Sequence, residues 1–353
     1  MLGPSEFREL VSGRRRGPLA TLARAALRLL EWPYAASVRW RNLRYDRGLA
    51  LIVRVEVPVI SVGNLTLGGT GKTPTIEWLA RWFADQQVRV GLVSRGYGAK
   101  PGHVNDEALE LARKLPDVPH VLDPDRAGGA RQAIQKFGCR LVLLDDAFQH
   151  RRIARDLDIV LVDALEPDGF GHVFPRGTLR EPLSGWNRAD VVMLTRTELA
   201  GETERAAIRQ RVREHAPEAI WVEATHAPQC LESASGERQS LDSLKGQRVA
   251  AFCGIGNPAG FRHALVDCGF QLADIREFAD HFVYSRGDIE ALVRWSDGLD
   301  VAAVLCTCKD LVKITIPWAG RAPLWAVSSR LQITHGQAEF ERALRPLADR
   351  AKG

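Results

Sequence analysis

The chain has 353 residues, of which 45% are apolar and 26% are charged, and its formal net charge is +5. This composition is ordinary for a folded soluble protein, and the length leaves room for two domains with their own cores. The net charge is too small for a protein that is basic over its whole surface, so no nucleic-acid partner is expected.

The basic residues are concentrated at the start of the chain. Residues 1–50 contain ten arginines and four acidic residues, a balance of +6, so the remaining 303 residues carry −1. This local excess of positive charge favours contact with an anionic surface.

An amphipathic helix is predicted over about residues 17–45, with its clearest pattern between Leu19 and Tyr34. It is too polar and too short to span a bilayer, which needs roughly 20 apolar residues, and arginines interrupt any signal-peptide core. Arginine clusters on both sides, with Trp32 and Trp40 between them, predict a helix that lies in the membrane interface. The alternative is a helix packed against its own domain. Its polar residues fall on one narrow stripe: Thr21, Arg24, Arg28 and Glu31.

The stretch Val57–Thr75 has the layout of a phosphate-binding loop, with an apolar strand, a glycine turn, Lys-Thr and a helix. The glycines would let backbone N–H groups close around phosphate oxygens. Lys72 would reach the β- and γ-phosphates, and the Thr73 hydroxyl would ligate Mg²⁺. Thr66 stands where the general pattern has glycine, so the alternative is a glycine turn that only caps a helix. The predicted nucleotide-binding residues are Thr66, Leu67, Gly68, Gly69, Thr70, Gly71, Lys72 and Thr73.

Strands and helices alternate after this loop, which predicts a doubly wound, mostly parallel sheet like that of P-loop NTPases, with helices on both faces. In such a sheet, ligands gather at the carboxyl ends of the strands. The expected strands are Val88–Ser94, Cys139–Leu144, Ile159–Val162, Val191–Leu194 and Ile220–Val222, and the expected helices are Asp125–Phe137 and Glu202–Glu214.

Asp145 and Asp146 end an apolar strand, as in a Walker B element, and are the predicted metal-binding acids together with Thr73. Alternatively, the paired acids cap the next turn. The loop 195–198 lacks the Asn-Lys-x-Asp pattern of a guanine-selective site, so ATP is the expected nucleotide.

Residues 226–353 are expected to form a smaller α/β domain, joined by a polar linker at 232–245 to a P-loop domain of residues 1–225. Its predicted elements are strands Arg248–Cys253, Val301–Cys306 and Leu324–Val327 and helices Gly287–Trp295 and Gln337–Leu347. The six cysteines are scattered without a Cys-x-x-Cys pair, which is typical of reduced core cysteines in a cytosolic protein. A metal site at Cys306 and Cys308 is the alternative.

Eight motifs follow one another along the chain: VGNLTLGGTGKTP, VSRGYG, NDEA, DDAFQHRRIARDLDIVLVD, FGHVFPRGTLREP, CGIGNP, FADHF and TCKDLVK. Together they resemble the tetraacyldisaccharide 4′-kinase family of lipid A biosynthesis over nearly the whole chain. Members of that family have Thr at the position of Thr66, so the resemblance supports the phosphate-binding loop.

The resemblance implies a lipid kinase that uses ATP and Mg²⁺. It would transfer the γ-phosphate to the 4′-hydroxyl of an acylated glucosamine disaccharide 1-phosphate at the cytoplasmic face of the inner membrane. The family's catalytic carboxylate and histidine match Asp106 and His281, and its metal-binding acid matches Asp145. No protein partner is implied.

Asp106 and His281 fall in different predicted domains, so domain closure is expected to assemble the site. As a pair, one removes the proton of the acceptor hydroxyl and the other orients its partner, which leaves the two roles open. Departures from the family pattern are Asn105, Ala108, Ala147 and Cys308.

Three arginines near the predicted cleft, Arg95, Arg126 and Arg180, could bind the substrate's 1-phosphate or equally be solvated. Two rival functions remain at this stage: a membrane-docked P-loop targeting ATPase and a kinase for a soluble small molecule. The targeting ATPase would not need Asp106 together with His281, whereas the small-molecule kinase would keep its activity on a soluble acceptor without residues 1–48.

Overall fold

The computed structural model describes residues 3–96, 111–279, 282–314 and 318–353. The chain divides into two compact units. The first comprises Met1–Gly96, Asp117–Thr225 and Ile333–Gly353, and the second comprises Tyr97–Pro116 and His226–Gln332. The last helix of the chain therefore belongs to the first unit.

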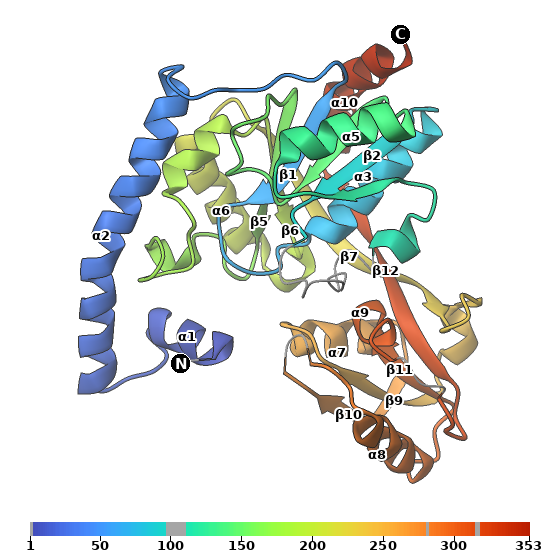
Figure 1. The fold of residues 1–353 in the computed structure, drawn as a ribbon. Helices are drawn as coiled ribbons and strands as arrows, with labels where there is room; N and C mark the ends of the chain where they lie inside the picture. Colours follow the sequence, from blue (N-terminus) through green and yellow to red (C-terminus); the bar gives the residue numbers. More distant parts are fainter. Residues whose placement is uncertain (1–2, 97–110, 280–281, 315–317) are drawn as a thin grey trace. The chain divides into compact units, whose positions relative to one another are not determined.

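The sheet of the first unit is parallel, with strand order β7-β6-β5-β1-β4-β2-β3 (Figure 1). β1 lies in the middle, and Val62 of β1 is in register with Asp145 of β4 and Ile159 of β5. All six β1 residues are buried, as the apolar run predicts. The strands are β1 (Val59–Asn64), β2 (Val90–Ser94), β3 (His120–Leu122), β4 (Leu141–Asp145), β5 (Leu157–Asp163), β6 (Val191–Thr195) and β7 (Ile220–Glu232).

Helices cover both faces of this sheet, which confirms the doubly wound fold. α5 (Arg126–Phe137) packs on Val59 and Val142, and α6 (Glu202–His215) packs on Val160, which the register places on the same face. α3 (Lys72–Asp85) and α10 (Gln337–Lys352) lie together through stacked Trp78 and Phe340 rings, 5.4 Å apart.

The strands of the second unit are parallel and follow the order β10-β9-β11-β12. Separate apolar clusters cover the two faces of these strands, one with α7 and the other with α8. The elements are β9 (Arg248–Cys253), α7 (Pro258–Asp267), β10 (Gln271–Glu277), α8 (Arg286–Asp297), β11 (Ala303–Thr307), α9 (Cys308–Leu311) and β12 (Leu324–His335).

The stretch at 232–245, expected to be a linker, is structured. β8 (Arg238–Ser240) pairs antiparallel with the end of β7, and a short 3₁₀ helix, η4 (Leu241–Leu244), follows. The prediction of a linker was wrong because Leu231 and Leu244, which flank the polar residues, are buried in the second unit's core.

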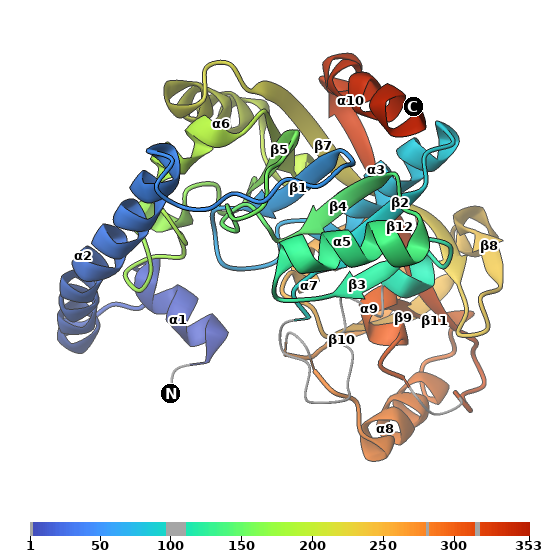
Figure 2. The same cartoon turned by 45° about the horizontal axis from the view of Figure 1, so that its top comes forward.

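The amino-terminal segment forms α1 (Pro4–Val11) and α2 (Pro18–Asp46), which contact each other in the first unit (Figure 2). α2 has 29 residues and continues through Pro33, so its bounds lie close to the predicted ones of about 17 and 45. Pro33 removes one backbone hydrogen bond, and the sequence pattern weakens there. The second half is held by packing, since Ala35 and Val38 are buried.

The polar stripe of α2 contacts the protein, whereas most of the large apolar side chains in its first half are exposed. Glu31 accepts a hydrogen bond from the backbone N–H of Val173 at 2.8 Å, and Arg24 donates to the carbonyl of Arg15 at 2.9 Å. Leu22 and Leu29 are 67% and 76% exposed. This is the reverse of a helix that buries its apolar face in its own domain. No helix within the described residues is long and apolar enough to cross a bilayer.

Candidate active site

The glycine turn after β1 is fixed by hydrogen bonds to its carbonyl groups. Asn64 Nδ2 donates to the carbonyl of Thr66 at 2.7 Å, and Thr195 Oγ1 donates to that of Thr70 at 3.0 Å. Arg196 donates to the carbonyl of Gly69 at 2.8 Å. These bonds hold the loop in one conformation at the carboxyl end of β1, where the phosphates of a nucleotide would be expected.

α3 begins directly after the turn, at Lys72. Gly71 caps it with φ +87°, and Gly68 has φ +127°, two conformations that favour glycine. The Thr75 hydroxyl donates to the carbonyl of Gly71 at 3.0 Å and closes the first turn. The backbone N–H groups of this helix start are therefore placed to bind an anion.

Lys72 faces the acidic pair that ends β4. Its Nζ lies 3.7 Å from Oδ1 of Asp146, and Arg180 donates to both oxygens of Asp146 at 2.9 Å. Burial acts to raise the pKa of Asp146, but Lys72, Arg180 and Arg126 outweigh it and lower the pKa below its ordinary value. Asp146 is therefore ionised at neutral pH.

Asp145 is the last residue of β4 and is buried, in register with Val62. Arg126, which opens α5 and is also buried, donates to the backbone carbonyl of Asp145 at 3.0 Å. Burial lowers the pKa of Arg126, and the carboxylates of Asp145 and Asp146 counteract this effect. Two acidic residues, Asp145 and Asp146, and two arginines, Arg126 and Arg180, therefore lie close together at the carboxyl end of β4.

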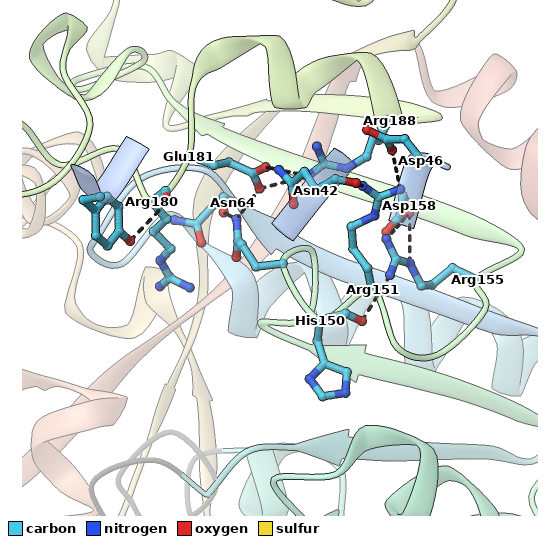
Figure 3. Close-up of polar contacts among 12 residues, drawn as sticks. Asn42, Asp46, Asn64, His150, Arg151, Arg155, Asp158, Arg180, Glu181 and Arg188 are labelled. Atoms are coloured by element: carbon cyan, nitrogen blue, oxygen red, sulfur yellow. Dashed lines mark hydrogen bonds and ion pairs between the residues drawn. The ribbon is translucent and has the colours of Figure 1, made fainter. Parts of the chain in front are cut away.

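A buried polar network connects this end of the sheet with α2 (Figure 3). Glu181 is fully buried, and Arg188 donates to both its oxygens at 2.8 and 2.9 Å. Asn42 of α2 donates to Glu181 at 2.8 Å. Gln149 donates to Glu181 at 3.0 Å and to the backbone carbonyl of Asn64 at 2.9 Å. Glu181 is thereby hydrogen-bonded to Asn42 of α2. Through Gln149 it is also connected to Asn64, the residue that orients the glycine turn.

The sequence model of the tetraacyldisaccharide-1-P 4′-kinase family matches residues 23–348 of the chain. A tetraacyldisaccharide 4′-kinase of Anaeromyxobacter sp. (strain K) is 39% identical over 345 residues, covering 93% of this chain and 90% of that protein. One from Desulfatibacillum aliphaticivorans is 37% identical over 350 residues, covering 92% of both chains. The chain belongs to the tetraacyldisaccharide-1-P 4′-kinase family.

A solved structure of this kinase family has the same fold. LpxK from Aquifex aeolicus, crystallised in complex with ATP, superposes with a TM-score of 0.72 at 28% identity, and the match covers 92% of this chain and 99% of that chain. The P-loop NTPase-like, mostly parallel sheet predicted from the sequence is therefore confirmed.

The structure brings together part of the predicted kinase site. Asp145 and Asp146 lie at the carboxyl end of β4, and Lys72 and Thr73 begin α3, which the glycine turn joins to the neighbouring strand β1. The two residues predicted for proton transfer, Asp106 and His281, lie outside the described residues, so their roles stay predictions.

The sequence alone does not decide whether Arg126 and Arg180 bind the substrate's phosphate or are solvated. Both contact the acidic pair, Arg180 through the side chain of Asp146 and Arg126 through the backbone of Asp145. Glu181 was not singled out, although it follows Arg180 in the motif FGHVFPRGTLREP, by which the chain resembles the kinase family. Membership of this motif is the one sign in the sequence that Glu181 has a role. Its burial cannot be predicted, because a single charged residue gives no pattern.

The second unit of the kinase contains a buried carboxylate beside two family motifs. Asp310 accepts hydrogen bonds from the Gly254 N–H at 3.0 Å, the Tyr284 hydroxyl at 2.9 Å and the Thr307 hydroxyl at 2.6 Å. Burial and the nearby Asp310 raise the pKa of Tyr284, which keeps its hydroxyl protonated and donating. Asp310 thus connects Gly254, directly after β9, and Thr307, at the end of β11, with Tyr284.

Proposed function

We propose that this chain transfers the γ-phosphate of ATP to the 4′-hydroxyl of a tetraacyldisaccharide 1-phosphate. The observation that carries the proposal is the position of Lys72, at the start of α3 and facing the ionised Asp146. The names of the curated relatives and the ATP complex of the structural relative support the choice of acceptor and donor.

Mg²⁺ fits the site through Asp145 and Thr73. Mg²⁺ in phosphoryl-transfer sites needs only one or two protein ligands besides phosphate oxygens and water. Asp145, the last residue of β4, matches the metal-binding acid of the family and is therefore the proposed carboxylate ligand. When bound, the ion neutralises charge on the β- and γ-phosphates.

The chain's own groups position the phosphates and stabilise their charge. Phosphoryl transfer has a loose transition state, so most of the catalysis comes from charge stabilisation and alignment. Lys72 and the N–H groups at the start of α3 supply positive charge, and Asp146 with Arg180 fixes the direction of the lysine. Asp106 and His281 are proposed, from the family resemblance, as the pair that removes the proton of the acceptor hydroxyl.

α2 is proposed to deliver the lipid acceptor at the cytoplasmic face of the inner membrane. Its exposed side chains include Leu22, Leu29 and Trp32, and its arginines would remain in the headgroup region. Several arginines near an anionic leaflet, at about 1 kcal/mol each, give reversible binding. No protein partner is proposed.

The decisive experiment follows labelled γ-phosphate from ATP with the full-length chain and detergent-dispersed tetraacyldisaccharide 1-phosphate. Label is expected on the lipid in the parent protein and not in Lys72→Ala. Release of label only as free phosphate would instead favour a membrane-docked P-loop ATPase. Equal labelling of a water-soluble sugar acceptor would favour a small-molecule kinase.

A further inference from the structure

A cavity of about 400 Å³ lies at the carboxyl-terminal end of α2. The helix contributes residues 41, 44 and 45, whose spacing places them on one helix face. The backbone N–H of Val53 donates to the carbonyl of Arg152 at 2.7 Å, which holds the loop after α2 against the segment before β5. The main lining side chains are Arg41, Arg44, Tyr45, Leu49, Leu51 and Arg152.

The cavity carries positive charge that the described part of the chain does not neutralise. None of its lining residues is acidic, and the described residues place no carboxylate in an ion pair with Arg41, Arg44 or Arg152. The Nε of Arg41 is buried without a hydrogen-bond partner among them. By contrast, the neighbouring Arg151 pairs with Asp46 at 2.7 Å. Three guanidinium groups around one cavity suit a phosphate group, whose oxygens accept paired hydrogen bonds.

This cavity is separate from the nucleotide site. Val53 and Ile153 form a parallel bridge before β1 and β5 begin, whereas the glycine turn follows the end of β1. A six-residue strand such as β1 spans roughly 20 Å. In Figure 1 the chain runs from the carboxyl end of α2 to the amino-terminal end of β1, whereas the glycine turn follows the carboxyl end of that strand. A phosphate in this cavity is therefore not a phosphate of the nucleotide held at Lys72.

The surroundings of the cavity match the interface of a bilayer. Leu49 and Leu51 are 66% and 73% exposed, and the guanidinium of Arg44 lies 5.1 Å from the centre of the exposed Trp40 ring. Exposed leucines beside arginines and a tryptophan are typical of segments that reach from headgroups into the acyl region. Other exposed apolar residues of α2, among them Leu22, Leu29 and Trp32, lie along the helix, which is about 43 Å long.

We propose that this cavity binds the phosphate of an anionic phospholipid headgroup, with Arg41, Arg44 and Arg152 around the phosphate and Leu49 and Leu51 in the acyl region. This inference extends the membrane docking proposed above and does not depend on catalysis. A headgroup held at one end of α2 fixes the rotation of the helix on the membrane. The same orientation would be kept whether or not substrate is bound.

The test is co-sedimentation of the full-length chain with vesicles of phosphatidylcholine, alone or with 30 mol% phosphatidylglycerol. Three proteins are compared: the parent, the triple variant R41K/R44K/R152K, and a control, R131K/R213K/R345K, at exposed arginines elsewhere in the first unit. All three have the same net charge, so simple surface attraction is equal. Thermal unfolding by circular dichroism checks that each is folded.

We expect the cavity variant to bind the anionic vesicles at least about tenfold more weakly than the parent, because ammonium groups do not form the paired hydrogen bonds of guanidinium. The control should stay within about twofold, and phosphatidylcholine vesicles should not distinguish the proteins. Equal binding of the cavity variant and the parent to anionic vesicles would overturn the headgroup site and leave only general surface charge. ATP affinity, measured alongside, should be the same in all three, so failure here is separable from failure of the kinase proposal.

Discussion

Lys72 is positioned by the glycine turn that precedes it and by the acidic residue that follows β4. Gly71 caps α3, whose first residue is Lys72. The carboxylate of Asp146, which is paired with Arg180, lies 3.7 Å from the ammonium group of Lys72 and holds it near the loop. Replacing Lys72 by Ala should lower the rate of phosphoryl transfer by at least about 100-fold, the effect typical of losing one group that stabilises charge in the transition state. Steady-state kinetics measures this loss.

Lys136→Ala is the matched control, because Lys136 is an exposed lysine of α5 away from the acidic pair. It should keep the parent's rate within about twofold. If Lys72→Ala were equally active, the glycine turn would be only a helix cap, and the nucleotide would have to bind elsewhere.

His120 gives a pH dependence of stability at the residue scale. Burial lowers the pKa of His120 from its ordinary 6.5 to about 4, and its Nε2 lies 2.8 Å from Ser94 Oγ. The unfolded chain therefore binds a proton at a higher pH than the folded chain does. The resulting stability is present above about pH 6.5 and is lost as the pH falls toward 4.

Between pH 7.5 and 5, the parent should lose about 2 kcal/mol more unfolding free energy than His120→Gln, which does not titrate in this range. Urea denaturation at several pH values measures the difference. Parallel pH profiles for the two proteins would mean that His120 is not the group responsible.

At the scale of elements, α2 carries the proposed membrane contact. Replacing Leu22 and Leu29 by Ser removes two exposed leucines that lie seven residues apart on one face. Each leucine would bury apolar area in the interface, so the double variant should bind vesicles at least about tenfold more weakly. Its thermal unfolding should match that of the parent, because neither leucine packs in the core.

The double variant Leu122→Ser/Val266→Ser changes exposed apolar residues on other elements and serves as the control. It should bind vesicles as the parent does. A loss of binding that is the same in both variants would show that general surface hydrophobicity, rather than α2, is responsible.

Glu181 joins α2 to the sheet through a fully buried carboxylate. Glu181→Ala would leave the half-buried Arg188 without its partner and remove the acceptor for Asn42. Breaking a buried ion pair by deleting one member costs about 3–5 kcal/mol of unfolding free energy. Denaturant unfolding measures this cost.

Glu214→Ala, on the exposed face of α6, is the comparison and should change the stability by less than about 0.5 kcal/mol. Hydrogen exchange in α2 should also rise in Glu181→Ala if Asn42 anchors that helix. Unchanged protection of α2 would contradict the proposed link.

At the scale of the whole molecule, the parts that could be predicted are those encoded by local pattern. The glycine turn before Lys72 and the apolar runs of β1 and β4 define their structures within a few residues of sequence, and the sheet follows from their alternation. The bounds of α2 could be predicted, whereas the contacts that hold the helix beyond Pro33 could not, because they involve distant residues such as Glu181. The Glu181 network was also hidden, because its members are the distant residues 42, 149, 181 and 188.

The division into two units likewise depends on contacts that no local pattern reports. The last helix, α10, belongs to the first unit through the stacking of Phe340 on Trp78 and a hydrogen bond from Arg140 to the carbonyl of Ala351, 3.0 Å long. The sequence predicted the helix itself because its apolar residues recur at helical spacing. Its packing partner lies more than 200 residues earlier in the chain, beyond the reach of periodicity.

The most direct measurement of the central claim locates the transferred phosphate on the product. The full-length chain is incubated with γ-labelled ATP and the lipid disaccharide 1-phosphate, and the product is treated with mild acid, which releases the glycosidic 1-phosphate but leaves a phosphate ester at the 4′-position. The account predicts that the label stays on the acylated disaccharide after this treatment and is absent with Lys72→Ala. Label released together with the 1-phosphate, or found only as free phosphate, would contradict it.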